Sequence, residues 1–327
     1  MQYQYRVLSR LLLSSVLCVG AWVFPVAAVS ARPTVDVLTI VEHPSLDAIR
    51  DGIRDELKAE GFTPGKTVKW EYQSAQGSPG TAAQIARVFV GSRPAVIVAI
   101  TTPAAQAVLA ATKHVPLVFA GVTDPVAAQL ITSFAPSGSN VTGVSDKMSM
   151  EKQVAFIQRV LPKAKRVGIV YNPGEANSVV VVKELQRLLP PLGMSLVEAP
   201  APRTVDIPTA ASNLVGKVDV IYTSTDNNVV SAYESLVKVA NAVKIPLIAS
   251  DTDSVKRGAL AALGINQYDM GRQAGKIVGR VLKGEKPGTI AAEVSQHYEL
   301  YLNLSTAEKQ GVIFPPALLK EAKEVIK

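Results

Sequence analysis

Cysteine is almost absent from this 327-residue chain, which contains only Cys18. A chain with one cysteine forms no internal disulfide, so nothing in it can scramble in an oxidising compartment. Histidine is also scarce: His43, His114 and His297 are scattered, and none has a second ligand at the spacing typical of a zinc or iron site. We therefore expect neither a metal nor another cofactor.

Charged residues make up only 19% of the chain, against 48% hydrophobic residues, and the mean hydropathy is +0.21. This composition argues against a disordered chain or a fibrous rod and predicts a globular protein of about two domains. Lysine and arginine total 34 against 27 acidic residues, a formal net charge of +7. Because the densest basic cluster, Lys163–Arg166, is so short, we expect a solvated basic surface and no nucleic-acid partner.

The start of the chain has the pattern of an export signal. Arg6 and Arg10 precede an apolar run, Leu11–Val23, and small residues follow it. This pattern predicts a signal peptide over residues 1–31 and a mature protein in the periplasm. The alternative is an uncleaved anchor, because residues 11–31 could nearly span a bilayer of about 30 Å. The proline, serines and glycine within the segment weaken that alternative.

From residue 34 onward, short β-branched runs alternate with longer segments of helical period. Leu46, Ile49, Ile53 and Leu57, for example, recur at spacings of three and four, as on one face of an amphipathic helix. Strand, helix and strand at this spacing predict an α/β fold of two similar halves with parallel sheets. The predicted strands are 35–40, 96–100, 117–120, 166–171, 195–199, 218–222, 247–249 and 298–304. The predicted helices are 46–57, 81–90, 104–111, 151–161, 178–189, 207–215, 229–243 and 270–282.

The loops after the predicted strands are rich in hydroxyl, amide and carboxylate groups, and ligands of open parallel sheets bind beyond the carboxyl ends of the strands. Helix N-termini suit a carboxylate. Asp124, Asp226 or Asp251 could pair with an ammonium, so a cleft that has both kinds of group suits a zwitterion. The alternative is that these residues are ordinary helix caps and turns. The candidate ligand-binding residues are His43, Ser74, Gln76, Thr101, Thr102, Thr123, Asp124, Asn172, Glu175, Asp226, Asn227 and Asp251.

Motifs of catalysis are missing from the sequence. It contains neither a G-x-S-x-G nucleophile elbow nor a G-x-G-x-x-G fingerprint. Gly61–Thr67 resembles a phosphate-binding P-loop, but that pattern needs glycine where Glu60 stands, and the segment precedes a strand instead of following one. We therefore expect no enzyme activity.

Several segments taken together resemble the ABC-transporter substrate-binding family that includes the tryptophan- and tyrosine-binding proteins. The resemblance covers nearly all of residues 34–312 and rests on 41–52, 72–77, 122–125, 171–178, 225–227 and 250–255. It implies a type I periplasmic binding fold, in which three crossing strands join two Rossmann-like lobes. The lobes would comprise residues 32–146 with 266–286, and residues 147–265 with 287–327.

The resemblance also implies a function. A monomeric protein would clamp a small zwitterion, an amino acid and preferably an aromatic one, between its lobes and present it to an ABC permease. Thr101 and Thr102 would hold the carboxylate, and Asp226 or Asp251 the ammonium, while the other candidates would form the rim. Two alternatives stay open: a periplasmic sensor for a signalling partner, and a binder of a different small metabolite. A sugar-repressor-like regulator shares this fold but would need a DNA-binding helix-turn-helix where the export segment stands.

Overall fold

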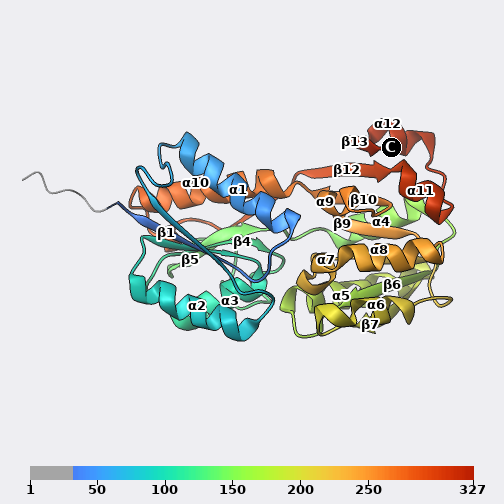
Figure 1. Ribbon diagram of the computed structural model, residues 1–327, viewed down its shortest axis with the longest axis horizontal. Coiled ribbons are helices and arrows are strands. Elements are labelled where there is room, and N and C mark those ends of the chain that lie inside the picture. Colours follow the sequence, from blue (N-terminus) through green and yellow to red (C-terminus); the bar gives the residue numbers. More distant parts are fainter. Residues whose placement is uncertain (1–31) are drawn as a thin grey trace, which may run out of the picture. The chain divides into compact units, whose positions relative to one another are not determined.

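Two predominantly parallel sheets, each covered by helices, organise residues 32–327, the part of the chain that the computed structural model describes (Figure 1). The predicted signal peptide, residues 1–31, lies outside the described residues. Between residues 32 and 327, no helix has both the length and the apolar character needed to cross a membrane.

The first sheet has six strands in the order β11-β5-β4-β3-β1-β2, and all of its pairs are parallel. Its strands alternate their side chains between two cores: Val35 and Val37 pack under one pair of helices, and Leu38 and Ile40 pack under another. We call this sheet and its four helices the first lobe. Its strands are β1 (Thr34–Thr39), β2 (Lys69–Ser74), β3 (Val96–Ile100), β4 (Leu117–Val122), β5 (Val141–Ser145) and β11 (Glu293–Val294).

Helices cover both faces of the first sheet. On one face lie α1 (Pro44–Ala59) and α10 (Gln267–Leu282), and on the other lie α2 (Pro79–Ser92) and α3 (Thr102–Ala111) (Figure 1). Between α1 and α10 the contact is close enough to require glycine, because a Cβ added at Gly271 would collide with the carbonyl of Ile49. The four predicted helices of this lobe are present, each within three residues of its predicted ends.

The second sheet has seven strands in the order β13-β12-β10-β9-β8-β6-β7, with β12 antiparallel to β10 and the other pairs parallel. We call this sheet and its helices the second lobe. Its strands are β6 (Arg166–Tyr171), β7 (Ser195–Pro200), β8 (Val220–Thr223), β9 (Leu247–Asp251), β10 (Ala261–Ile265), β12 (Tyr298–Asn303) and β13 (Glu324–Ile326). The helices are α4 (Met150–Val160), α5 (Ala176–Leu188), α6 (Ile207–Ser212), α7 (Asn227–Ser231), α8 (Tyr233–Ala242), α9 (Thr252–Lys256), α11 (Leu304–Gln310) and α12 (Pro316–Glu321), with 3-10 turns at η1 (Pro190–Leu192) and η2 (Thr204–Asp206).

Besides the short elements α9, α11, α12 and β13, which were not predicted, two further features of the second lobe differ from the sequence prediction. The helix expected over 229–243 is divided at Ala232 into α7 and α8, and the Ala232 amide donates to two carbonyls, those of Asn228 and Val229. In addition, β10 lies inside the sheet, between β12 and β9, although no strand was expected there.

The chain passes between the lobes three times, after β5, between β10 and α10, and between β11 and β12. The third passage lies later in the chain than the sequence boundary at residue 287. A 3-10 turn, η3 (Pro287–Thr289), and β11 both belong to the first lobe, because Gly138 donates to the Gly288 carbonyl and β11 pairs with β5. A two-residue strand carries no periodic pattern by which sequence could have placed it.

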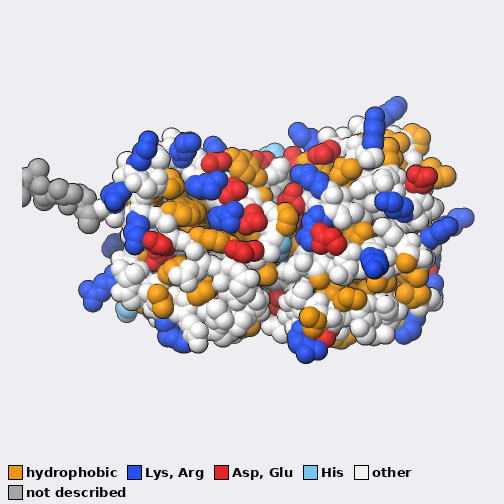
Figure 2. Space-filling model, viewed as in Figure 1, with side chains coloured by type: hydrophobic (Ala, Val, Ile, Leu, Met, Phe, Trp, Pro, Cys, Tyr) orange, Lys and Arg blue, Asp and Glu red, His pale blue; other side chains and the backbone are white. Residues whose placement is uncertain are grey.

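Charged side chains of both signs are interspersed over the face seen in Figure 2, and they form no single basic patch on that face. Many are paired, for example Arg166 with Asp219 at 2.7 Å. Exposed pairs of this kind contribute little to stability and mainly keep the surface solvated.

Candidate functional site

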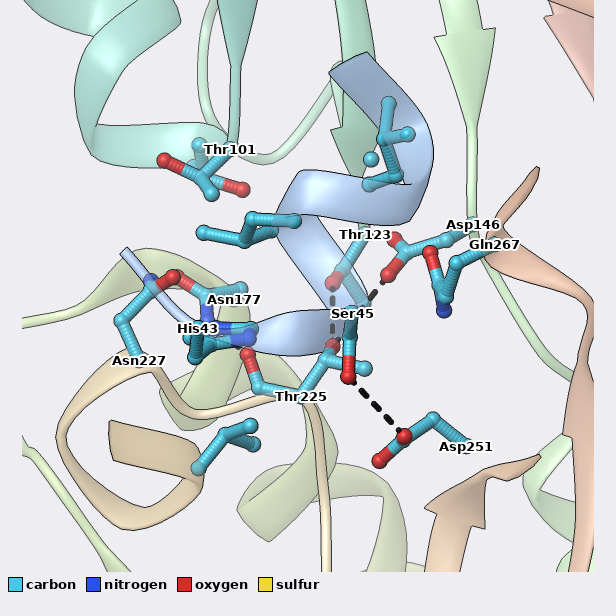
Figure 3. Close-up of a pocket in the computed structure, with 15 residues that line it drawn as sticks. His43, Ser45, Thr101, Thr123, Asp146, Asn177, Thr225, Asn227, Asp251 and Gln267 are labelled. Carbon is cyan, nitrogen blue, oxygen red and sulfur yellow. Dashed lines mark hydrogen bonds between the residues drawn. The ribbon is translucent and has the colours of Figure 1, made fainter. Parts of the chain in front are cut away.

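A pocket between the two lobes collects the carboxyl ends of strands from both sheets, where open parallel sheets bind their ligands. Figure 3 shows the polar side chains that line it. The lining residues are His43, Ser45, Leu46, Ile49, Thr101, Thr102, Gly121, Thr123, Asp146, Asn177, Thr225, Asn227, Val230, Asp251 and Gln267.

Five buried polar atoms of this lining have no hydrogen-bond partner among the described residues. They are His43 Nδ1, Thr101 Oγ1, Thr102 Oγ1, Asp146 Oδ1 and Asn177 Oδ1. A buried polar atom without a partner costs about 1–3 kcal/mol, so native proteins keep few of them. Their concentration in one pocket indicates a polar ligand that supplies the missing bonds.

Hydrogen-bond donors come from the start of α3. The hydroxyls of Thr101 and Thr102 are both unpartnered, and that of Thr101 does not cap its own helix. Thr101 has φ of 90°, a left-handed backbone that a β-branched residue adopts only under strain. Together with the partial positive charge at the N-terminus of α3, these hydroxyls suit an anionic oxygen.

Hydrogen-bond acceptors come from Asp146 and Asn177. Asp146 is only 4% exposed, and its Oδ2 accepts from Thr225 Oγ1 at 3.3 Å while its Oδ1 is free. Burial raises the pKa of Asp146, and the charge of Asp251 raises it further. The Asn177 amide donates to the Thr225 carbonyl at 3.1 Å and to Glu175 at 3.2 Å, which leaves its oxygen for the pocket. A cation in the pocket would satisfy both acceptors.

Asp251 lines the same pocket, but protein groups already engage both of its oxygens. Its Oδ1 accepts from the Ser254 amide at 2.9 Å and from Ser45 Oγ at 3.2 Å, and its Oδ2 accepts from Ser254 Oγ at 2.6 Å. Asp251 therefore caps α9 and also bonds to α1 in the first lobe.

His43 presents a neutral ring to the pocket. Burial, with the charge of Arg257 as the second cause, lowers its pKa to about 3. The imidazole is therefore uncharged at neutral pH, and its free Nδ1 can form a hydrogen bond with a ligand but cannot supply a counter-charge.

The pocket has a volume of about 20 Å³, and hydrogen bonds join the two lobes beside it. Ser45 Oγ bonds to Asp251 Oδ1, and the hydroxyls of Thr123 and Thr225 lie 3.4 Å apart (Figure 3). These contacts tie the first lobe to the second, which is the arrangement expected of lobes that have closed.

The structure brings half of the predicted site residues into this pocket and places the other half elsewhere. Those that line it are His43, Thr101, Thr102, Thr123, Asn227 and Asp251. Those that do not are Ser74, Gln76, Asp124, Asn172, Glu175 and Asp226.

Three of the residues outside the pocket lie in the first lobe. Ser74 ends the edge strand β2, and Gln76 follows it and donates to Glu42 at 3.4 Å. Asp124 forms an ion pair with Lys147 at 2.7 Å.

The other three form a buried cluster beneath the pocket. Asp226 is fully buried and accepts from Ser178 Oγ and the Asn172 amide, both at 2.6 Å, while its other oxygen caps α7. Glu175 accepts from Asn227 Nδ2 at 2.6 Å. The side chains of Asn227 and Asn177 line the pocket, and Glu175 holds both of them in place by accepting their hydrogen bonds.

Five polar lining residues were missed by sequence reasoning: Ser45, Asp146, Asn177, Thr225 and Gln267. Three of them, Ser45, Asn177 and Thr225, stand in loops that the strand-end rule had already singled out. Asp146 directly follows β5, so the same rule could have found it. Gln267 follows β10, the strand that was not expected.

Residues 34–326 match the model of a protein family described as "ABC transporter substrate binding protein". The chain belongs to this family. Proteins of the family bind small molecules outside the cytoplasm and work with ABC permeases. A tyrosine-binding protein of Clostridioides difficile is 39% identical over 275 residues, which cover 84% of this chain and 80% of that protein.

Two solved relatives have equal sequence identity to this family member but different structural similarity. An ABC domain from Streptococcus pneumonia in complex with L-Trp is 34% identical, with a TM-score of 0.87 over 90% of this chain and 100% of the other. The ligand-free, open structure of a substrate-binding protein with adhesive properties from Clostridium difficile is also 34% identical, with a TM-score of 0.68 over 90% and 99%. The lobes of this family member are thus arranged more like the complex than like the open protein. Distant solute-binding proteins, 15% and 13% identical, share the type I periplasmic binding fold.

Proposed function

We propose that this protein binds an amino acid, preferably an aromatic one, in the periplasm and presents it to an ABC permease for import. The observation that carries the proposal is that the polar atoms without hydrogen-bond partners in the pocket fall into two sets, donors in one place and acceptors in another. Hydroxyl donors stand at the start of α3, and free acceptor oxygens stand on Asp146 and Asn177. A zwitterion has the complementary pair of charges.

In the proposed complex the carboxylate of the ligand accepts from Thr101 and Thr102, and its ammonium donates to Asp146 and Asn177. The ammonium would offset the unfavourable burial of the Asp146 carboxylate, because an opposite charge stabilises the ionised form. His43 adds a neutral hydrogen bond. This assignment replaces both predicted ammonium partners, Asp226 and Asp251, with Asp146, since both oxygens of each are already bonded.

The preference for an aromatic side chain rests on relatives. One relative is a tyrosine-binding protein, and another was solved in complex with L-Trp. The lining also offers apolar surface from Leu46, Ile49 and Val230.

Import follows from closure of the lobes. A ligand that contacts both lobes stabilises the closed arrangement over the open one, and a permease can read that difference. The predicted signal peptide supports the periplasmic location.

The test is a binding screen on purified residues 32–327, freed of ligand by unfolding and refolding. Each of the twenty amino acids is added in a thermal-shift assay, where a ligand at 100 times its Kd should add about 2.7 kcal/mol of stability. Calorimetry then compares L-tyrosine with tyramine, which lacks the carboxylate, and with 3-(4-hydroxyphenyl)propionate, which lacks the ammonium. We expect L-tyrosine or L-tryptophan to bind and both analogues to bind far more weakly.

Two outcomes would contradict the proposal. If no amino acid raises the unfolding temperature, the ligand belongs to another class. If the host lacking this protein takes up the bound amino acid at the normal rate, the protein senses its ligand and does not import it.

A further inference from the structure

A second cavity of about 290 Å³ adjoins the ligand pocket and shares Thr123 and Thr225 with it. The hydroxyls of this pair lie 3.4 Å apart, and both residues line both spaces. The cavity is lined by Thr123, Lys147, Met148, Ser149, Met150, Glu151, Val180, Val181, Glu184, Arg187, Tyr222, Ser224 and Thr225.

The inner end of the cavity carries two buried hydroxyls without partners. Tyr222 is 0% exposed and Ser224 is 3% exposed. Neither hydroxyl forms a hydrogen bond of normal geometry among the described residues, although the Ser250 hydroxyl lies close enough to that of Tyr222 to lower the pKa of the phenol. Burial raises the pKa of Tyr222, so its phenol keeps its proton. A ligand group that donates or accepts a hydrogen bond would satisfy these atoms.

The walls of the cavity are apolar. Val180 and Val181 extend from α5, and Met148 and Met150 lie before and at the start of α4. Methionine side chains adapt their shape and make favourable sulfur contacts with aromatic rings. Such walls favour a flat apolar group over a polar chain.

The charges at the mouth are paired with one another. Lys147 pairs with Asp124 at 2.7 Å, and Arg187 pairs with Glu184 at 2.7 Å and Glu151 at 3.0 Å. Because each of these charged groups already has an ion-pair partner of opposite sign, the cavity offers its occupant no unpaired charge at the mouth. The occupant should therefore be neutral.

We propose that this cavity receives the side chain of the bound amino acid, and that it selects a neutral aromatic ring bearing a hydrogen-bonding group, such as a phenol or an indole. The inference rests on the proposed function. The first pocket, at about 20 Å³, holds the polar groups of the ligand, whereas the adjoining cavity has room for a ring. The ring enters as the Thr123 and Thr225 hydroxyls separate, and it ends against Tyr222 and Ser224.

The first experiment fills the cavity from its wall. Val180→Trp places a large ring in the cavity, and Val179→Trp is the matched control, because Val179 lies on the same helix and does not line the cavity. We expect Val180→Trp to weaken L-tyrosine and L-tryptophan at least about 50-fold by calorimetry, and the control to change Kd by less than about threefold. Thermal unfolding of both variants without ligand checks that they fold.

The second experiment removes the buried phenol. Tyr222→Phe should weaken L-tyrosine by about 5- to 30-fold, because the ligand hydroxyl loses a partner, and should change the Kd for L-phenylalanine by less than about twofold. Equal effects on both ligands would show that Tyr222 acts on the pocket as a whole and would overturn the selection by hydroxyl.

A competition experiment distinguishes a side-chain subsite from an independent site. p-Cresol, the tyrosine side chain without its charged groups, should compete with L-tyrosine and should lose its binding in Val180→Trp. If p-cresol binds equally well to the L-tyrosine complex, the cavity is a separate site and the inference fails.

If L-tyrosine binds but Val180→Trp and Val179→Trp have equal Kd, the inference also fails while the proposed function stands. If wild type binds no amino acid at all, the proposed function itself fails.

Discussion

Ser45 Oγ donates a hydrogen bond of 3.2 Å to Asp251 Oδ1, and this bond joins α1 of the first lobe to the carboxyl end of β9 in the second (Figure 3). Both residues are buried, at 5% and 2% exposure. A bond between lobes that must separate to admit ligand contributes only when the lobes are closed. It therefore couples closure to ligand affinity.

The variant Ser45→Ala should lower affinity more than stability. Loss of one hydrogen bond to a carboxylate costs about 1–2 kcal/mol, which corresponds to about a 5- to 30-fold rise in Kd. Calorimetry measures this change, and small-angle scattering with and without ligand measures the closed fraction.

Ser92→Ala is the control for this prediction. Ser92 Oγ donates to Asp36 Oδ2 at 3.0 Å, a similar bond made within one lobe. We expect it to lower the unfolding temperature and leave Kd unchanged. If the two variants have the same effect on Kd, the Ser45 bond plays no part in closure.

Asp146 and Asp226 should respond differently to removal of their charge. Asp146→Asn keeps the shape of the pocket and removes the proposed ammonium partner, so the Kd for the amino acid should rise at least about tenfold. Its unfolding temperature without ligand should not fall, because burial already disfavours this carboxylate.

Asp226→Ala leaves the Ser178 hydroxyl, the Asn172 amide and the cap of α7 without an acceptor. We expect a loss of about 2–4 kcal/mol of stability in urea unfolding. Asp206→Asn, whose carboxylate pairs with Arg203 and lines neither cavity, serves as the control for binding. An unchanged Kd in Asp146→Asn would contradict the ammonium assignment.

The fold was predictable from sequence in segments where hydrophobic residues follow a clear strand or helix pattern. Strands 96–100 and 166–171 were predicted with their observed ends, because β-branched runs buried on both faces leave little choice. The strand β10 was missed, since Ala261–Ile265 is rich in alanine and glycine, which have low strand propensity. Gly264 is required there by a contact with the backbone of Asp251, which a local pattern does not reveal.

The site was predictable only to the level of loops. Parallel topology places the right loops together, but it does not say which side chain of a loop faces the cleft. Asp226 follows β8 and Asp251 ends β9, and each caps the short helix that begins at the next residue. Tertiary neighbours alone decide that Asp251 also lines the pocket whereas Asp226 is enclosed by Ser178 and Asn172.

Glu175 should make stability fall as pH rises. Burial, with the charge of Asp226 as the second cause, raises its pKa from a reference value of 4.5 to about 7. Between these values the folded protein keeps a proton that the unfolded chain releases, so the contribution is fully present below pH 4.5 and is lost as pH passes 7.

The corresponding experiment measures the unfolding temperature from pH 5 to 8.5. Over this range the unfolding temperature of wild type should fall relative to that of Glu175→Gln, because the neutral amide releases no proton, whereas the lowered pKa of His43 contributes equally to both proteins. Glu308→Gln, on the exposed side of α11, should follow wild type. Parallel curves for wild type and Glu175→Gln would assign the pH dependence to other groups.

Gly271→Ala should destabilise the first lobe through the contact between α1 and α10. The added Cβ would collide with the carbonyl of Ile49, so the helices must move apart, at a cost of about 1–3 kcal/mol. Gly91→Ala in α2 is the matched control, because its Cβ meets no atom within 4 Å and alanine favours a helix by about 0.5–1 kcal/mol. Urea unfolding should therefore give changes of opposite sign, and equal stability of the two variants would contradict close packing. Since α1 brings His43 and Ser45 to the pocket, the same displacement should also weaken ligand binding in Gly271→Ala and leave it unchanged in Gly91→Ala.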